Sequence, residues 1–222
     1  MKDQKLTVNP LLNSIRKEYE IHVLLEEQCH KDPVIQFERW LKDAIDTGDD
    51  HANAMVLSTV QANGMPDSRV VLLRNISYGG FTFYTNYKSK KANDINGNSK
   101  ASLLFFWKEL ERQIRIQGEI KFLPTKESDD YFRERPFESR VGAWASQQSS
   151  EIKNRKELDD VFENKLKEFA GQDVPRPEHW GGYVFLPSRY EFWQGRPSRL
   201  HDRIQYQMDG TKKIWNRTRL MP

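Results

Sequence analysis

Residues 54–73 read AMVLSTVQANGMPDSRVVLL, two apolar runs separated by a short polar stretch. The runs Ala54–Val60 and Ser68–Leu73 are rich in valine and leucine, which is typical of β-strands. Between them lies Ala62-Asn63-Gly64, and Asn-Gly favours a hairpin turn because both residues tolerate a positive φ. The stretch therefore predicts a pair of antiparallel strands.

Three further strands are expected soon after this hairpin, at Phe81–Thr85, Ala101–Trp107 and Gln113–Phe122. The connections are too short for repeated helical crossovers, which favours an antiparallel barrel or sandwich over a doubly wound parallel sheet. Near the C-terminal end the pattern predicts strands again, at Tyr183–Leu186, Tyr190–Trp193, Leu200–Met208 and Lys213–Arg219. We predict an α+β fold that is mainly β, an antiparallel barrel decorated with helices.

The helices are expected before the barrel and within it. Asn9-Pro10 and Asp32-Pro33 each resemble a helix start, and the second precedes an amphipathic stripe that stops near Gly48. Within the barrel, Thr125 is expected to cap a helix that Pro136 ends, and the apolar spacing from Ile152 to Phe169 predicts a longer one. We therefore divide the chain into an N-terminal helical segment, 1–50, and a barrel, 51–222, which together form one domain.

Composition excludes several classes of protein. The chain has 222 residues and a net charge of only +3, which does not indicate a genome-binding protein. No apolar run approaches the roughly 20 residues of a membrane span, and the N-terminus leads into no apolar signal region. The lone Cys29 and the scattered histidines match no disulfide framework and no metal-site spacing. We expect a cytoplasmic protein with no metal and with neither nucleic acid nor membrane as partner.

The segment 191–203, EFWQGRPSRLHDR, concentrates basic groups among aromatic ones. If the chain is extended from Arg199, the period of two places Arg199, His201 and Arg203 on one strand face and turns Leu200 into the packing. Such a face suits an anionic ligand. The ordinary alternative is a solvated face whose cations pair with acids such as Asp202 and Glu191.

Three other basic clusters are weaker signals. Arg69 and Arg74 bound an apolar strand, Lys88-Ser89-Lys90-Lys91 follows the strand 81–85, and Tyr131 lies one helical turn before Arg135. Regular alternation puts Arg69 and Arg74 on opposite faces, so if both reach ligands a bulge or the strand end must re-aim one of them. Solvated charges explain each cluster alone. Together with the segment 191–203 they indicate two phosphate sites and a flat aromatic ligand.

The segment Glu191–Gly195 followed by Arg199–Arg203 resembles the signature of the pyridoxine/pyridoxamine 5′-phosphate oxidase family. The resemblance continues over nearly the whole chain. Its further motifs are Arg16–Tyr19, Phe37–Leu41, Arg69–Arg74, Phe83–Asn86, Glu111–Gln113, Gly142–Ser146, Gln148–Ser150, Trp180–Gly182 and Arg219–Pro222. At two places the chain differs from the usual pattern, because the family commonly has Lys at Arg74 and Arg-Lys at Lys90-Lys91. Both differences keep the positive charge.

The resemblance implies an FMN-binding split β-barrel that works as a homodimer, with FMN between the subunits. It also implies the reaction, the oxidation of pyridoxamine or pyridoxine 5′-phosphate to pyridoxal 5′-phosphate with O2 reduced to H2O2. The FMN phosphate is then expected at Arg69, Lys90, Lys91, Gln148 and Ser149. The flavin ring is expected along Val70, Val71, Leu72, Tyr84, Thr85 and Gln113, with Trp193 and Arg203 closing the site.

For the substrate, the resemblance places the phosphate at Arg74, Tyr131, Arg135 and Ser139. Arg199 and His201 are expected over the pyridine ring as the catalytic pair, with Arg199 orienting the substrate and His201 assisting proton movement. Arg16 and Tyr19 are expected to cover the bound substrate.

Two other readings of the sequence stay open. One is another split-barrel flavin oxidoreductase with a different substrate, which is expected to lack the Arg199-x-His201 pair and the Tyr131/Arg135 pair. The other is a barrel that binds single-stranded nucleic acid through its aromatic residues and basic loops. A protein that purifies with bound flavin argues against the second.

Overall fold

The computed structural model describes residues 18–222. The helix expected to begin at Asn9-Pro10 lies outside these residues, as does Arg16. The helices in chain order are η1 (Glu26–Gln28), α2 (Pro33–Asp46), α3 (Lys90–Gly97), η2 (Lys108–Leu110), α4 (Thr125–Glu134), α5 (Phe137–Ala145), α6 (Arg155–Glu168) and η3 (Pro197–Arg199). The strands are β1 (Ala54–Val60), β2 (Pro66–Leu72), β3 (Asn75–Ser77), β4 (Gly80–Asn86), β5 (Lys100–Trp107), β6 (Arg112–Phe122), β7 (Trp180–Gln194), β8 (Asp202–Met208) and β9 (Trp215–Arg219).

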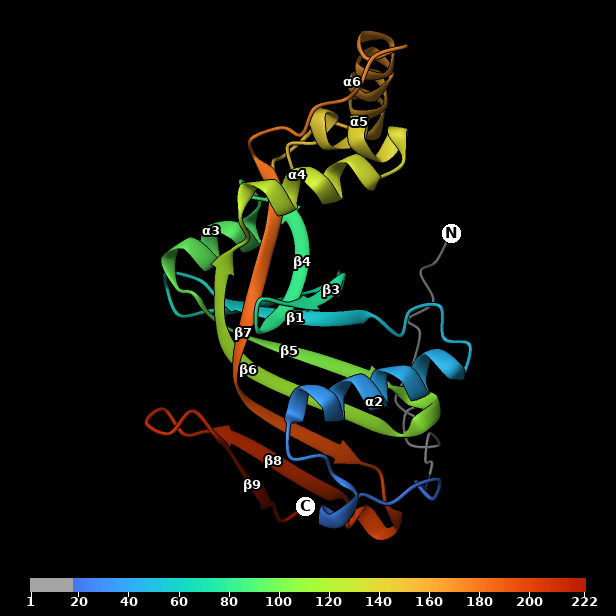
Figure 1. Cartoon of the computed structure of the whole chain (residues 1–222). Helices are drawn as coiled ribbons and strands as arrows, with labels where there is room; N and C mark the ends of the chain where they lie inside the picture. The colour runs from blue at the N-terminus through green and yellow to red at the C-terminus, as the bar shows by residue number, and fades with distance from the viewer. Residues whose placement is uncertain (1–17) are drawn as a thin grey trace, which may run out of the picture.

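The strands form one antiparallel sheet that curves into a half-barrel (Figure 1). Its order is β2-β1-β5-β6-β7-β4-β3, and β8 and β9 extend it from the C-terminal half of β7. The predicted hairpin is confirmed: β1 pairs with β2, and Gly64 turns the chain with φ +83°. The α+β, mainly antiparallel fold class predicted from the sequence is therefore correct.

The long strand β7 differs from the prediction of two separate strands at 183–186 and 190–193. It runs unbroken for 15 residues and pairs with both β6 and β4. The register with β6 shifts between Gln117 and Gly118, so a bulge accommodates the Pro187-Ser188 interruption. A Cβ at Gly118 would lie 2.1 Å from the carbonyl oxygen of Leu186, so this close approach requires glycine.

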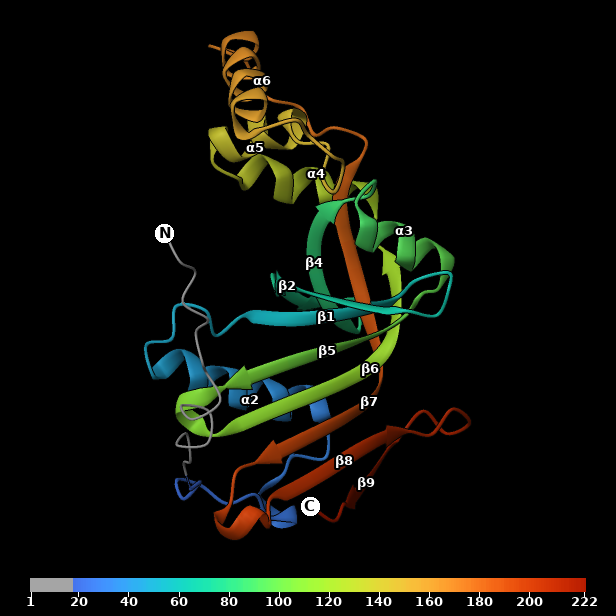
Figure 2. The ribbon, with the colours of Figure 1, turned by 180° about the vertical axis from the view of Figure 1, so that it is seen from behind.

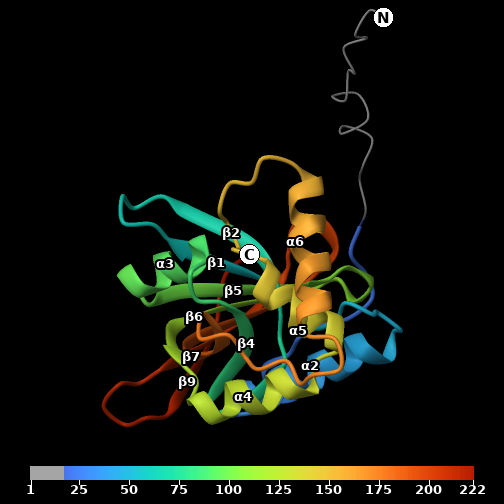
Figure 3. The same ribbon diagram turned by 90° about the horizontal axis from the view of Figure 1, so that it is seen from above.

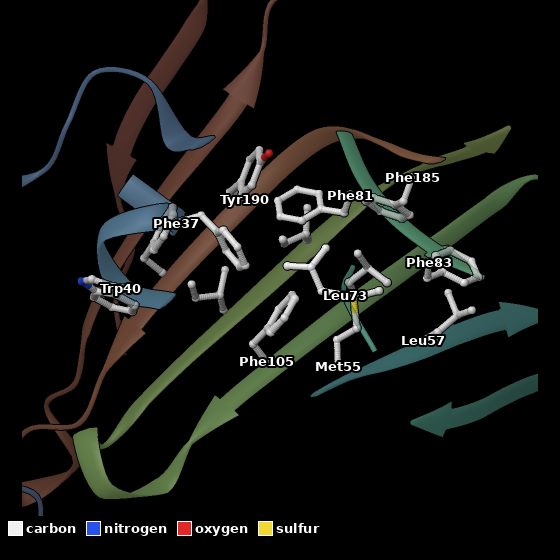
Figure 4. Close-up of a cluster of buried hydrophobic side chains, with 14 of the residues drawn as sticks. Phe37, Trp40, Met55, Leu57, Leu73, Phe81, Phe83, Phe105, Phe185 and Tyr190 are labelled. Atoms are coloured by element: carbon white, nitrogen blue, oxygen red, sulfur yellow. The ribbon is translucent and has the colours of Figure 1, made fainter. Parts of the chain in front are cut away.

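One face of the sheet carries the hydrophobic core, and α2 covers it (Figure 4). The helix begins as predicted, with Asp32 Oδ1 accepting the Val34 N–H and with Pro33 in the first turn. Its Phe37 ring packs edge-on against Phe81 and Phe105, at centroid distances of 4.8 and 4.9 Å. Because α2 shares this core, the helix is part of the barrel's packing. The division of the chain at residue 50 stays a prediction.

The opposite face of the sheet is seen in Figure 2, where β1, β5, β6 and β8 lie in front and α2 lies behind. Large apolar side chains on this side are open to solvent, among them Val70 (65% exposed) and Phe106 (54%). Exposed apolar side chains of this kind are available to pack against another protein surface, and Val70 also lines the cavity described below.

The helical insert stands at one end of the sheet, where α4, α5 and α6 pack together (Figures 1 and 3). Thr125 begins α4 but does not cap it, because the N-cap is Pro124 and no side chain caps the helix. The helix α5 was not predicted, since its short apolar pattern includes Gly142. None of the helices within residues 18–222 is sufficiently long and apolar to cross a bilayer.

Candidate functional site

A cavity of about 700 Å³ lies between the ends of β2 and β4 and the helices α3, α4 and α5. Most of its lining was predicted from the sequence: Arg69, Val70, Val71, Leu72, Arg74, Tyr84, Thr85, Lys91, Tyr131, Arg135, Ser139 and Gln148. The prediction missed Asn86, Gly142, Ala143, Ser146 and Trp180. These five belong to motifs that carried the family resemblance, but the resemblance gave no role to them.

Arg69 and Arg74 both line this cavity although strand alternation separates them. The expected re-aiming occurs at the strand end, since β2 stops at Leu72 and the Arg74 N–H donates to the carbonyl oxygen of Thr82. The Arg69 guanidinium is held in place, donating to Thr59 Oγ1 at 2.7 Å and pairing with Asp67 at 2.9 Å. Its position is therefore set before any ligand binds.

Lys91 extends from the first turn of α3 toward neutral oxygens. Its Nζ donates to Thr85 Oγ1, Ser89 Oγ and Gln148 Oε1 at 3.0 to 3.3 Å. Burial, followed by the neighbouring Arg69, lowers the pKa of Lys91. No carboxylate among the described residues pairs with this ammonium, so an anion in the cavity would neutralise it.

Arg135 follows the last turn of α4, with its guanidinium 4.5 Å from the centre of the Trp180 ring. Its Nη1 is buried and has no hydrogen-bond partner. Burial lowers the pKa of Arg135, and the nearby Arg74 acts in the same direction. A buried donor without a partner costs about 1–3 kcal/mol, which is recovered when an acceptor binds there.

Three aromatic rings form a stack beside these arginines. Tyr84 stacks on Tyr131 at a centroid distance of 3.8 Å and on Trp180 at 5.5 Å. Burial raises the pKa of Tyr84 to about 12, so its hydroxyl stays protonated and can donate a hydrogen bond. The stack fixes Tyr131 next to Arg135 and Ser139, at the α4–α5 end of the cavity.

A second group of predicted residues lies elsewhere, around the end of β7 and the turn before β8. We call the predicted residues Tyr19, Trp193, Arg199 and His201, together with Arg196, which was not predicted as a site residue, the His201 cluster. His201 lies 4.6 Å from Trp193 and 5.9 Å from Tyr19, measured between ring centroids. Gln113, opposite Trp193 in the sheet, belongs to the same region. None of these residues lines the cavity.

The predicted shared strand face of Arg199, His201 and Arg203 is wrong. Arg199 ends η3 with φ +61°, and Ser198 before it has φ +56°, so the chain turns here instead of extending. Strand β8 begins only at Asp202. Leu200, expected to pack inward, is 69% exposed. Pro197 starts this turn, and two successive left-handed residues cost about 1–2 kcal/mol each, so tertiary contacts must hold it.

His201 has a defined tautomer in this turn. The backbone N–H of Arg196 donates to Nδ1 of His201 at 3.1 Å, so the neutral ring carries its proton on Nε2. Burial, followed by the positive charge of Arg199, lowers the pKa of His201 below its ordinary 6.5. At neutral pH His201 is therefore an N–H donor through Nε2.

The ordinary alternative of acids paired with the arginines holds in part. Arg203 Nε donates to Glu191 at 2.9 Å, and its Nη1 donates to the carbonyl oxygen of Met221 at 2.7 Å. Arg115 also contacts Glu191. Lys90 likewise pairs with Asp67 at 2.7 Å and does not line the cavity, and Ser149 Oγ accepts the Lys90 backbone N–H. Within residues 18–222 no cluster of three or more His, Cys, Asp or Glu is arranged to hold a metal ion.

Comparison with known proteins identifies the family. Residues 41–166 match the family model of pyridoxamine 5′-phosphate oxidase, and residues 180–222 match that of the pyridoxine 5′-phosphate oxidase C-terminal dimerisation region. The chain belongs to the pyridoxine/pyridoxamine 5′-phosphate oxidase family. The resemblance found in the sequence is confirmed, and with it the enzyme class.

Members of the pyridoxine/pyridoxamine 5′-phosphate oxidase family match the chain over nearly its whole length. The protein of that name from Cytophaga hutchinsonii is 50% identical over 214 residues, covering 95% of this chain and 98% of the relative. The Bordetella pertussis protein is 49% identical over 211 residues, covering 95% and 99%.

Solved structures of the same fold support the architecture. PhzG from Burkholderia lata, in complex with tetrahydrophenazine-1-carboxylic acid, superposes with a TM-score of 0.84 at 30% identity, covering 91% of this chain and all of PhzG. A pyridoxamine 5′-phosphate oxidase-related FMN-binding protein from Nostoc punctiforme has a TM-score of 0.68 at 17% identity, covering 84% of this chain and 97% of that protein, and shows the fold alone.

Proposed function

We propose that this protein is an FMN-dependent oxidase that converts pyridoxamine or pyridoxine 5′-phosphate to pyridoxal 5′-phosphate, with O2 reduced to H2O2. The observation that carries the proposal is the charge in the cavity. Arg74, Lys91 and Arg135 line it, and among the described residues none of the three has a carboxylate partner. Three such cations in one cavity suit phosphorylated ligands. A cytoplasmic location stays a prediction.

The cofactor side of the cavity fits the phosphate of FMN. Arg69, Lys91, Gln148 and Thr85 converge there, and the Lys91 ammonium donates hydrogen bonds to three neutral oxygens. We assign the FMN phosphate to Arg69 and Lys91 with Gln148, Ser149 and Lys90 near it, and the ring to Val70–Leu72, Tyr84 and Thr85. FMN supplies the acceptor for the hydride that leaves the substrate. The chain supplies charge and orientation.

The substrate side fits a second phosphate. We assign it to Arg74, Tyr131, Arg135 and Ser139, where the unpartnered Arg135 Nη1 provides the best-defined donor. Arg199 is assigned to orienting the substrate amine or hydroxyl, since a guanidinium keeps its proton at all working pH values. His201 is assigned to holding a proton on Nε2 toward the substrate.

The remaining assigned residues come from the His201 cluster, with Gln113 and Arg203 beside it, and these do not line the cavity. Trp180 in the cavity and Trp193 in the cluster are 13 residues apart on β7, up to about 40 Å of extended strand. We propose that a homodimer joins the cavity of one subunit to the His201 cluster of its partner. The match of residues 180–222 to a dimerisation region and the exposed apolar face of the sheet support this.

A direct assay tests the function. Purified protein reconstituted with FMN is given pyridoxamine 5′-phosphate in air, and aldehyde and H2O2 are measured together. Equal rates of both products support the proposal, and no turnover of either vitamin B6 phosphate contradicts it. Turnover of tetrahydrophenazine-1-carboxylic acid alone supports the other split-barrel oxidoreductase instead. Tetrahydrophenazine-1-carboxylic acid carries a carboxylate instead of a phosphate and gives a different product, so the assay distinguishes the two activities.

A further inference from the structure

The N-terminal segment, residues 18–24, crosses the end of β7 without forming a helix or strand. Tyr19 from this segment packs edge-on against Trp193, at a centroid distance of 5.7 Å, and lies beside His201. Because the segment has no ladder of its own, its position depends on hydrogen bonds to the elements beneath it.

Glu111 supplies two of these hydrogen bonds. Its Oε2 accepts the backbone N–H of Glu20 at 2.9 Å and that of Ile21 at 3.2 Å. The residue is only 1% exposed, in the turn between η2 and β6. Two backbone amides thus share one buried side-chain oxygen. The carboxylate therefore fixes the backbone immediately after Tyr19.

The backbone of Glu111 also holds Gly195, the residue on which Tyr19 packs. Its carbonyl oxygen accepts the Gly195 N–H at 2.8 Å, one residue after β7 ends. Gly195 lies directly under Tyr19, since a Cβ there would lie 2.7 Å from both Cβ and Cγ of the tyrosine. A single residue thus joins the segment that carries Tyr19 to the strand that carries Trp193.

The backbone conformation of Glu111 also indicates that its carboxylate is needed at this position. Glu111 has φ +54°, a left-handed backbone that side-chain-bearing residues rarely adopt and that a glycine would adopt without strain. A glycine there would remove the carboxylate that holds the segment. The strained turn aims this carboxylate at the Glu20 and Ile21 amides.

We infer that Glu111 is a positioning residue for substrate binding, which acts by holding Tyr19 against Trp193 and His201. The inference rests on the proposed function and on the role that the family resemblance implies for Tyr19, which is to cover the bound substrate. A cover of this kind interacts equally with the ground state and the transition state, so its loss raises KM and leaves kcat nearly unchanged.

The test compares Glu111→Ala with Glu111→Gln, whose amide oxygen still accepts both N–H groups, and with Glu109→Ala, an exposed acid in the neighbouring turn. In FMN-loaded protein, Glu111→Ala is expected to raise the KM for pyridoxamine 5′-phosphate about tenfold with kcat within about twofold. Glu111→Gln is expected to keep most of the wild-type KM, and Glu109→Ala to leave it unchanged. In a Tyr19→Ala background, Glu111→Ala is expected to add less than about twofold.

Hydrogen exchange of a peptide spanning residues 18–22 provides a readout independent of turnover. Glu111→Ala is expected to speed exchange of the Glu20 and Ile21 amides, and Glu109→Ala is not. Gly195→Ala, which displaces Tyr19 from the strand side, is expected to raise KM similarly even if Glu111→Ala fails to fold. Unchanged exchange and KM in Glu111→Ala, or full additivity with Tyr19→Ala, overturns the inference. Altered exchange in a protein that turns over no vitamin B6 phosphate leaves the anchoring intact and refutes the proposed function.

Discussion

Replacing Arg135 with Met tests the assignment of the substrate phosphate. Arg135→Met keeps the bulk against Trp180 but removes the charge and the unpartnered Nη1. A charge-assisted hydrogen bond contributes roughly 1.5–3 kcal/mol, so kcat/KM for pyridoxamine 5′-phosphate should fall about ten- to a hundredfold. The matched control is Arg133→Met, since Arg133 pairs with Asp130 at 2.6 Å and is mostly exposed.

The Arg135→Met variant also gives a prediction for the stability of the ligand-free protein. The variant loses a cation–π contact worth about 0.5–2 kcal/mol. It also loses a buried donor whose desolvation costs about 1–3 kcal/mol without a ligand. The two contributions largely offset each other, so the free energy of unfolding of the ligand-free protein should change by between about −1 and +2.5 kcal/mol. Steady-state kinetics with pyridoxamine and its 5′-phosphate, together with thermal denaturation, check both. Equal losses for the two substrates, or an equal loss in Arg133→Met, would refute the assignment.

Three other predictions follow from the site. Lys91→Ala should weaken FMN binding by about ten- to a hundredfold and riboflavin binding far less, measured by flavin fluorescence titration; equal losses would mean that Lys91 does not contact the phosphate. Arg199→Lys should lower kcat/KM about tenfold or more with FMN content unchanged, because the planar fork is lost; full activity, or a protein without FMN, would contradict its orienting role. Since the pKa of His201 is lowered, the neutral ring predominates above pH 6.5, and kcat/KM should be level there and fall only at lower pH. A fall in kcat/KM between pH 8 and 6.5 that His201→Gln abolishes would contradict this, because it would place the titration of His201 above its ordinary value.

Local signals were enough to predict much of the sheet. The Asn63-Gly64 turn and the apolar alternation of β6 depend on neighbouring residues only, and both were predicted correctly. That β7 is a single strand was not predicted, because Pro187 interrupts the apolar pattern. The strand continues through this position because it pairs with β6 and β4. Tertiary pairing overrides local propensity at such positions.

The cavity lining was predicted largely through the family resemblance, whereas the geometry at its ends was not. Alternation alone separates Arg69 from Arg74, and the end of β2 brings both into one cavity. Alternation also gave Arg199 a strand face that the left-handed turn at Ser198 and Arg199 removes. Glu111 was missed as a functional residue because its role depends on contacts some 90 residues away in the chain. Long-range contacts of this kind leave no local pattern in the sequence.

Subunit mixing tests the central claim most directly, that the cavity of one chain and the His201 cluster of another form one oxidase site. One chain carries Arg74→Met with Arg135→Met, the other carries Arg199→Ala, and heterodimers are purified through two different tags. Each parent homodimer lacks an intact site, but the heterodimer joins one wild-type cavity to one wild-type cluster. The account predicts about half of the wild-type activity per dimer with pyridoxamine 5′-phosphate. A heterodimer as inactive as both parents would contradict it.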